Sequence, residues 1–146
     1  MKQLEQWLDA YSVSHQNPTN KMIHNICVPV IFFVVVALLW KISFFLFVLV
    51  AAGAIAFYYL LGKQVAILGA VMIGASLVLH WILGFGWITL LVLFGLAWAG
   101  QFYGHKIEGQ KPSFFDDLKF LLIGPLWVAK PWLGKLGVTE ALPPKT

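Results

Sequence analysis

The sequence predicts an all-α integral membrane protein, a bundle of four transmembrane helices, and two features of its composition lead to this prediction. The 146 residues are 60% hydrophobic and only 11% charged, so a water-soluble domain of this size would have too few polar side chains to cover its surface. The apolar residues are also gathered into long stretches that carry almost no charge. We expect a single membrane domain over residues 1–146.

Three stretches contain no Lys, Arg, Asp or Glu, and Gly84-Phe85-Gly86 interrupts the longest of them. The stretches are residues 22–40, 42–62 and 64–104. A transmembrane helix needs about 20 predominantly apolar residues. No cleavable signal peptide is expected, because a polar segment precedes the first apolar stretch. We therefore expect four spans, near residues 25–40, 43–61, 65–83 and 87–104.

The lysines predict how the spans are oriented. Four spans place both termini and the middle loop on one side of the membrane, and every lysine except Lys41 lies on that side. Because cytoplasmic loops are enriched in positive charge, residues 1–24 and 105–146 are expected to be cytoplasmic or interfacial, around spans within 25–104. The membrane would be the cytoplasmic membrane of a bacterium or the endoplasmic reticulum of a eukaryote.

The segment before the first span has the pattern of an amphipathic helix over residues 3–14. Its apolar face consists of Leu4, Trp7, Leu8 and Tyr11. Asn17-Pro18 is expected to end this helix, and Asn20 is expected to cap the first span. The N-terminal segment is therefore predicted to lie against the inner end of the spans.

The segment after the fourth span contains helical pieces that are too short to cross a membrane. Residues 113–116 resemble a helix capping box, and the apolar run 120–123 ends at Gly124-Pro125. We expect an interfacial or re-entrant helical hairpin that covers the inner end of the spans.

Small residues recur at four-residue spacing on two of the spans. Such rows allow membrane helices to approach closely, because packing drives their association. The rows are Ala66, Ala70 and Gly74 on the third span, and Gly100 and Gly104 on the fourth. The spans are therefore expected to form a bundle.

Three of the four histidines stand at the two ends of the apolar region, in polar surroundings. His15 and His24 lie at the start of the first span, and His105 ends the fourth, three residues before Glu108. The predicted topology brings all four groups to the cytoplasmic side. Histidines with a carboxylate suit non-haem Fe(II) that keeps positions open for oxygen and a substrate. We expect a metal site with His15, His24 and His105 as ligands.

Other polar residues of the same two segments are candidates for supporting roles. Tyr11 lies one helical turn before His15 and shares its face. Tyr11 and Glu108 are the candidate catalytic residues, and whether Glu108 binds the metal or orients a ligand stays open. The residues expected to orient ligands through hydrogen bonds are Asn17, Asn20 and Gln101.

Other interpretations stay open at this point. The histidines would suit helix caps and headgroup contacts, or two of them would suit a haem group. A non-enzymatic scaffold or transporter is a further alternative, although few polar side chains lie deep in the predicted spans. No basic surface with interleaved aromatic residues indicates nucleic-acid binding. His80, beside Trp81, is expected near the outer interface, about 20 Å or more from the other histidines, and is not expected to be a ligand.

The two polar segments together resemble the signatures of a known family. The first is Tyr11, His15, Asn17-Pro18, Asn20, His24 and Pro29, and the second is the block 101–105 with Glu108, Pro112 and Gly124-Pro125. They resemble a family of small multi-pass membrane proteins whose eukaryotic members convert phytosphingosine to odd-numbered fatty acids. The resemblance runs from about residue 6 to 127. The family often places the glutamate four residues after the histidine, whereas Glu108 follows His105 by three.

The resemblance implies an Fe(II)-dependent dioxygenase, a membrane 2-hydroxy fatty acid dioxygenase that shortens the acyl chain by one carbon in α-oxidation. Its partners would be a 2-hydroxy fatty acid, O₂ and membrane lipid. The acyl tail is expected in the lipid, and the 2-hydroxy acid is expected at the inner interface, where Fe²⁺ would bind its hydroxyl and carboxylate. Lys106 or Lys111 is expected to attract that carboxylate. Acyl chain length and oligomeric state are left open.

Overall fold

The computed structural model describes residues 4–13, 15–109 and 120–133, and the described residues form helices. The elements are α1 (Leu4–Val13), α2 (Pro18–Ile42), α3 (Phe44–Leu61), α4 (Lys63–Leu83), α5 (Trp87–Ile107), α7 (Ile123–Val128) and the 3₁₀ turn η1 (Lys130–Trp132). Four of them, α2 to α5, are long and apolar enough to cross a membrane. The all-α fold and the four predicted spans are therefore confirmed.

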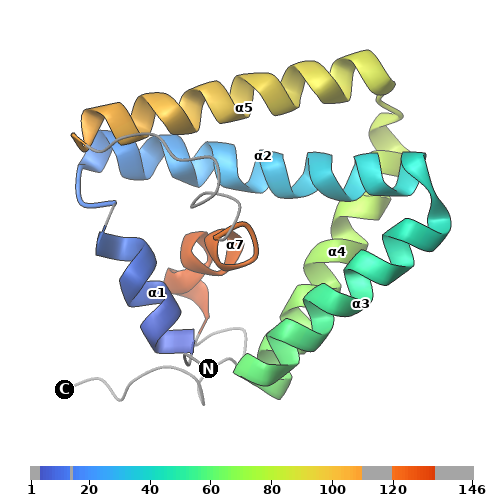
Figure 1. Cartoon of the computed structure of the whole chain (residues 1–146), viewed down its shortest axis with the longest axis horizontal. Coiled ribbons are helices and arrows are strands. Elements are labelled where there is room, and N and C mark those ends of the chain that lie inside the picture. The colour runs from blue at the N-terminus through green and yellow to red at the C-terminus, as the bar shows by residue number, and fades with distance from the viewer. Residues whose placement is uncertain (1–3, 14, 110–119, 134–146) are drawn as a thin grey trace.

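The four long helices are arranged as two antiparallel pairs (Figure 1). Helices α2 and α5 lie side by side, and α3 and α4 form a second pair that runs obliquely to the first. Helix α2 contacts both members of the second pair. Because the pairs are oblique, one end of the arrangement leaves room between them, and α1 and α7 lie there.

The amphipathic helix predicted at the N-terminus is confirmed as α1. Its apolar face does not lie open to the membrane surface but is buried against protein. Leu4, Leu8 and Tyr11 form one core cluster with Ile123 and Leu126 of α7. The same cluster includes residues from the end of α3 and the start of α4. These contacts draw α1, α7 and the α3–α4 turn together at one end of the molecule.

The cap of α2 corrects a prediction. Asn17, and not Asn20, is the N-cap: its side-chain oxygen accepts hydrogen bonds from the backbone N–H groups of Thr19 (2.8 Å) and Asn20 (3.3 Å). Pro18 occupies the first helical turn, where its missing N–H costs nothing and its fixed φ suits a helix. The Asn17-Pro18 pair therefore starts the span as well as ending the preceding segment. The helix continues through Pro29.

Only one of the two predicted rows of small residues makes a close helix contact. A Cβ added at Gly100 would lie 2.7 Å from the Cys27 sulfur, so α5 and α2 approach closely there. On α4, Ala66 is buried in the core cluster with Tyr58, but the prediction is wrong for Ala70 and Gly74, which are exposed. Gly69 makes the contact instead, beneath the Tyr58 ring. The buried residues of α4 recur mostly at steps of three and four positions, since a helix has 3.6 residues per turn.

The interruption predicted at Gly124-Pro125 is also corrected. Both residues lie in the first turn of α7, where a proline removes no intrahelical hydrogen bond. The chain before α7 is held by the Tyr58 hydroxyl, which donates to the Leu122 carbonyl at 2.7 Å. The predicted capping box over 113–116 lies outside the described residues.

Candidate functional site

The three histidines that flank the apolar region come together in space. His15 follows α1, His24 is on α2 and His105 is near the end of α5. Their ring centroids are separated by 4.2 Å (His15–His24), 5.3 Å (His24–His105) and 5.9 Å (His15–His105). All three side chains are buried. Three separate segments of the chain therefore contribute one imidazole each to a single cluster.

Hydrogen bonds to the backbone define the tautomers of two of these histidines. Nδ1 of His15 lies 2.6 Å from the Tyr11 carbonyl, and Nδ1 of His24 lies 3.1 Å from the Asn20 carbonyl. A carbonyl oxygen can only accept a hydrogen bond, so each Nδ1 carries the proton and donates. In a neutral ring, Nε2 then carries the lone pair. A proton fixed on one ring nitrogen by a carbonyl is the usual arrangement of histidines that bind metals.

The environment of His15 favours the neutral ring. Burial lowers its pKa below the ordinary value, the hydrogen bond to Tyr11 opposes this shift, and the nearby His105 adds to it. A neutral imidazole is the form that donates a lone pair to a metal. His15 is therefore suited to act as a ligand at neutral pH.

Aromatic side chains enclose His15 on two sides. The Tyr11 ring stacks on the imidazole at a centroid distance of 4.2 Å and an interplanar angle of 5°. The Trp127 ring of α7 lies 5.2 Å from it, and the Trp127 indole N–H donates to the Ser12 hydroxyl at 2.9 Å. Tyr11 thus positions His15 through both its ring and its carbonyl. No sequence pattern placed Trp127 beside a histidine.

Glu108 fastens the end of α5 to the loop before α2. Its carboxylate accepts a short hydrogen bond from the Asn17 backbone N–H. Partial burial raises the pKa of Glu108, but hydrogen bonds from the Asn17 backbone, the Asn20 side chain and the Gln16 backbone outweigh it, so the pKa is lowered overall. Glu108 is therefore ionised at neutral pH and directed at the segment that carries His15.

Helices α2 and α5 approach most closely beside the histidines. A Cβ added at Gly104 would lie 2.1 Å from the Asn20 side-chain oxygen and 3.1 Å from Cε1 of His24. Any larger residue would clash with the Asn20 side chain and crowd His24. Asn20 is fully buried in this contact, and its carbonyl holds His24. The predicted role of Asn20 in orienting a ligand therefore has a structural basis.

The remaining predicted site residues are less directly involved. Asn17 caps α2, and its backbone N–H donates a hydrogen bond to the Glu108 carboxylate. Asn17 therefore acts on the histidines through the position of the loop before α2. Gln101 is buried one turn before His105 and lines a small cavity with Tyr11 and Trp98.

The histidine cluster fits a metal ion in its chemistry. Its imidazoles are buried together, and two of them have the tautomer that directs Nε2 as the donor atom. Imidazole is a ligand for iron, zinc, copper and nickel. Within residues 4–13, 15–109 and 120–133, no group of three or more His, Cys, Asp or Glu side chains is placed so that it could hold a metal ion. The argument for a metal ion therefore rests on the three imidazole side chains and on the hydrogen bonds that hold two of them.

His80 lies elsewhere. It is buried near the end of α4 and lines a cavity of about 240 Å³ with Trp40 and Trp81. Its Nδ1 is buried without a hydrogen-bond partner among the described residues. In the part of the chain that the structure describes, His80 makes no ring contact with the three clustered histidines.

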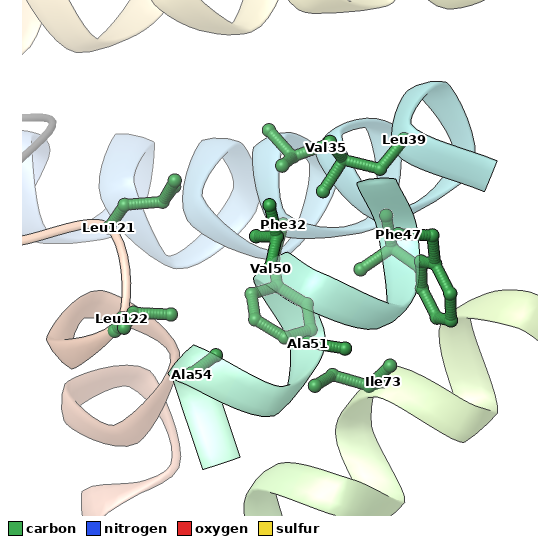
Figure 2. Close-up of a pocket in the computed structure, with 11 residues that line it drawn as sticks. Phe32, Val35, Leu39, Phe47, Val50, Ala51, Ala54, Ile73, Leu121 and Leu122 are labelled. Atoms are coloured by element: carbon green, nitrogen blue, oxygen red, sulfur yellow. The ribbon is translucent and has the colours of Figure 1, made fainter. Parts of the chain in front are cut away.

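Two further hollows are bordered by α2. A cleft of about 520 Å³ opens beside His15 and is bordered by α2, α7 and η1. A smaller apolar groove of about 70 Å³ lies farther along α2, and Figure 2 shows side chains of α2, α3 and α4 around it, with Leu121 and Leu122 at one end.

Comparison with known proteins identifies the family. The chain is 29% identical to the 2-hydroxy-palmitic acid dioxygenase MPO1 of Saccharomyces cerevisiae over 148 aligned positions, which cover 95% of this chain and 84% of the yeast protein. No solved structure matches it. A family model described as "2-hydroxy-palmitic acid dioxygenase Mpo1-like" matches residues 1–136. The chain, with its four apolar helices and histidine cluster, therefore belongs to the Mpo1-like family.

Proposed function

We propose that this protein is an Fe(II)-dependent dioxygenase that converts a 2-hydroxy fatty acid to the fatty acid one carbon shorter. Similarity to a dioxygenase supports an oxidoreductase, and the name of the yeast relative supports a 2-hydroxy acid as substrate. On atom balance, the 2-hydroxy acid and O₂ give the shortened carboxylic acid, carbon dioxide and water. The observation that carries the proposal is the convergence of His15, His24 and His105, two of them with Nδ1 held by carbonyls.

The side chains divide the work of such a reaction. His15, His24 and His105 would hold the metal, and Fe(II) would supply the chemistry with O₂ that side chains lack. The Tyr11 ring and the two backbone carbonyls keep the imidazoles in place. Glu108 holds the His15 loop against α5. Trp127 shields one side of His15 from water.

We also propose that the histidine end of the protein faces the cytoplasm. This end comprises helices α1 and α7, the α3–α4 turn, the N-terminal end of α2 and the C-terminal end of α5. Among the described lysines, Lys41 alone lies at the opposite end of α2. The distribution of positive charge favours the cytoplasm for the richer side. Reporter fusions at both termini test this orientation, and terminal reporters active only on the outer face would overturn it.

The function is tested with purified protein loaded anaerobically with Fe²⁺. Oxygen uptake and product mass are measured with 2-hydroxyhexadecanoic acid and, as the matched control, hexadecanoic acid. We expect consumption of O₂ and a fifteen-carbon product only with the hydroxy acid. A haem absorption band in the isolated protein, or no turnover with iron bound, would reject the proposal.

A further inference from the structure

The cleft of about 520 Å³ beside His15 has a chemical character that the histidine cluster does not explain. His15 is the one member of the cluster that borders it. The cleft therefore connects the surface of the protein directly to the candidate metal site. Among the described residues that line the apolar groove of Figure 2, none is polar, so they offer no partner for a charged group.

Two lysines from different elements border this cleft. Lys21 comes from the first turns of α2 and Lys130 from η1, and both are exposed. Among the described residues that line the cleft, none is an Asp or a Glu. The ionised Glu108 lies near the cleft but accepts hydrogen bonds from the backbone of Asn17 and Gln16. The two cations of the lining therefore create a positive potential that attracts an anion. Asn25, one helical turn after Lys21, adds an amide on the same face.

The other lining of the cleft is apolar and aromatic. Trp127 and Trp132 border it, and Trp132 is 55% exposed although it is one of the largest side chains in the protein. Tryptophan with one apolar face and one polar edge is typical of membrane interfaces. The cleft thus joins an anion-attracting part to a part that accepts hydrocarbon.

We propose that this cleft is the substrate entrance, where Lys21 and Lys130 bind the carboxylate of a long-chain 2-hydroxy acid and Trp127 and Trp132 contact the first part of its chain. The inference rests on the proposed function. The carboxylate has two oxygens, so two lysines can share it, and the 2-hydroxyl carbon is then presented towards His15.

This proposal replaces the lysines that the sequence suggested for the same task. Lys106 is exposed on α5 and does not line the cleft. Lys111 lies outside the described residues. Residues far apart in the sequence, at positions 21 and 130, contribute the two charges instead, because η1 and the start of α2 border one cleft.

The test measures binding to the metal-free protein, so that no metal contributes to carboxylate recognition. Binding of 2-hydroxyhexadecanoic acid and of its methyl ester is compared by tryptophan fluorescence in neutral detergent. We expect the wild type to prefer the acid, Lys21→Gln and Lys130→Gln to lose up to about fivefold in acid affinity each, and ester affinity to stay unchanged. Lys63→Gln, an exposed lysine outside the cleft, is the matched control.

Charge-conserving variants and kinetics complete the test. Lys21→Arg and Lys130→Arg should retain preference for the acid, and in the iron-loaded protein the Gln variants should raise KM while changing kcat little. Equal affinity of the wild type for acid and ester would overturn the proposal, and so would an unchanged acid preference in the double Gln variant. If the double Gln variant kept its preference for the acid and still turned over the hydroxy acid, only the entrance proposal would fail. The proposed dioxygenase function would then stand.

The phosphate of a lipid headgroup would be attracted by the same two cations. The binding experiment is therefore repeated with phosphatidylglycerol added to the micelles. The proposal requires the lysines to affect acid binding in both conditions. A lysine effect on binding of the anionic lipid but not of the acid would identify the cleft as a headgroup site and overturn it.

Discussion

Buried histidines occur at both ends of this protein, and the two places differ in how the histidine is held. At one end His15, His24 and His105 share a cluster whose ring centroids are 4.2–5.9 Å apart. At the other end His80 lies between tryptophans, and its Nδ1 has no hydrogen-bond partner among the described residues. Burial of an imidazole is common to both. Convergence of three chain segments, with carbonyls that fix the tautomer, distinguishes the candidate site.

The helix packing differs between the same two ends. Gly104 brings α5 against Asn20 and His24, and Gly100 brings it against Cys27. Towards the other end of α5, a Cβ added at Gly95 or Gly86 would meet nothing within 4 Å. Of these glycines, only Gly100 and Gly104 lie against α2, whereas Gly95 and Gly86 are exposed. Predictions that separate the two ends follow from this contrast.

The largest effect is expected from loss of a clustered histidine. His15→Ala, His24→Ala and His105→Ala should each lower iron affinity by more than about 100-fold, beyond the loss expected for a residue that only orients a ligand. Activity should disappear with the iron, while the amount of membrane-inserted protein stays similar. Metal analysis and oxygen uptake measure this. Full iron content in all three variants would remove the basis for a metal site.

A large effect is also expected from one methyl group at the closest helix contact. Gly104→Ala places a Cβ against Asn20 and His24, and overpacking of this kind costs about 1–3 kcal/mol. Iron binding and activity should fall together with thermal stability. Gly95→Ala in the same helix is the control, because the added methyl group meets open space and alanine favours a helix by about 1 kcal/mol over glycine. Equal behaviour of the two variants would contradict the packing argument.

An intermediate effect is expected at Glu108. Glu108→Gln keeps the shape of the side chain but removes the negative charge of the group that accepts the hydrogen bond from the Asn17 backbone N–H. Because Glu108 acts through the His15 loop, we expect a 10- to 100-fold loss of metal affinity, about the loss measured for residues that orient ligands. Iron titration distinguishes this partial loss of affinity from a complete loss of iron binding. A complete loss would indicate that Glu108 is itself a ligand. Glu5→Gln, a change of the same kind on α1, is the control.

The Glu108 contact also predicts a pH dependence. The pKa of Glu108 is lowered in the folded protein, so the ionised carboxylate stabilises the fold above the ordinary glutamate pKa. This stabilisation is lost as the pH falls below about 4.3 and through the lowered value. Thermal unfolding of the metal-free protein should therefore differ between wild type and Glu108→Gln at pH 7, and the difference should shrink in acid. A constant difference would argue against the ionised contact.

The smallest effect is expected at the other end. His80→Ala should leave iron content and activity close to those of the wild type, because His80 lies with Trp40 and Trp81 and not with the clustered histidines. Only a modest loss of stability is expected from the vacated space. A folded His80→Ala protein without iron would mean that the two ends had been assigned the wrong roles.

The class of this protein follows from its amino-acid sequence alone. Charge-free stretches of membrane-spanning length fix four helices, since a lipid environment requires each backbone polar group to be paired within its own helix. The histidines and Glu108 were identifiable because polar residues are few and stand at the ends of apolar runs. The apolar face of residues 3–14 likewise follows from helical periodicity, and it became the buried face of α1.

The contacts that those residues make depend on how the helices pack against one another. Local spacing places Ala70 and Gly74 on one helix face but does not say which face meets a partner, so the contact at Gly69 was missed. Trp127 and Lys130 are more than 100 positions away from His15, and only the packing of α7 against α1 and α2 brings them to it. Sequence periodicity describes one helix at a time. The candidate site is made by several helices at once, and their relative positions depend on side-chain packing that no single segment contains.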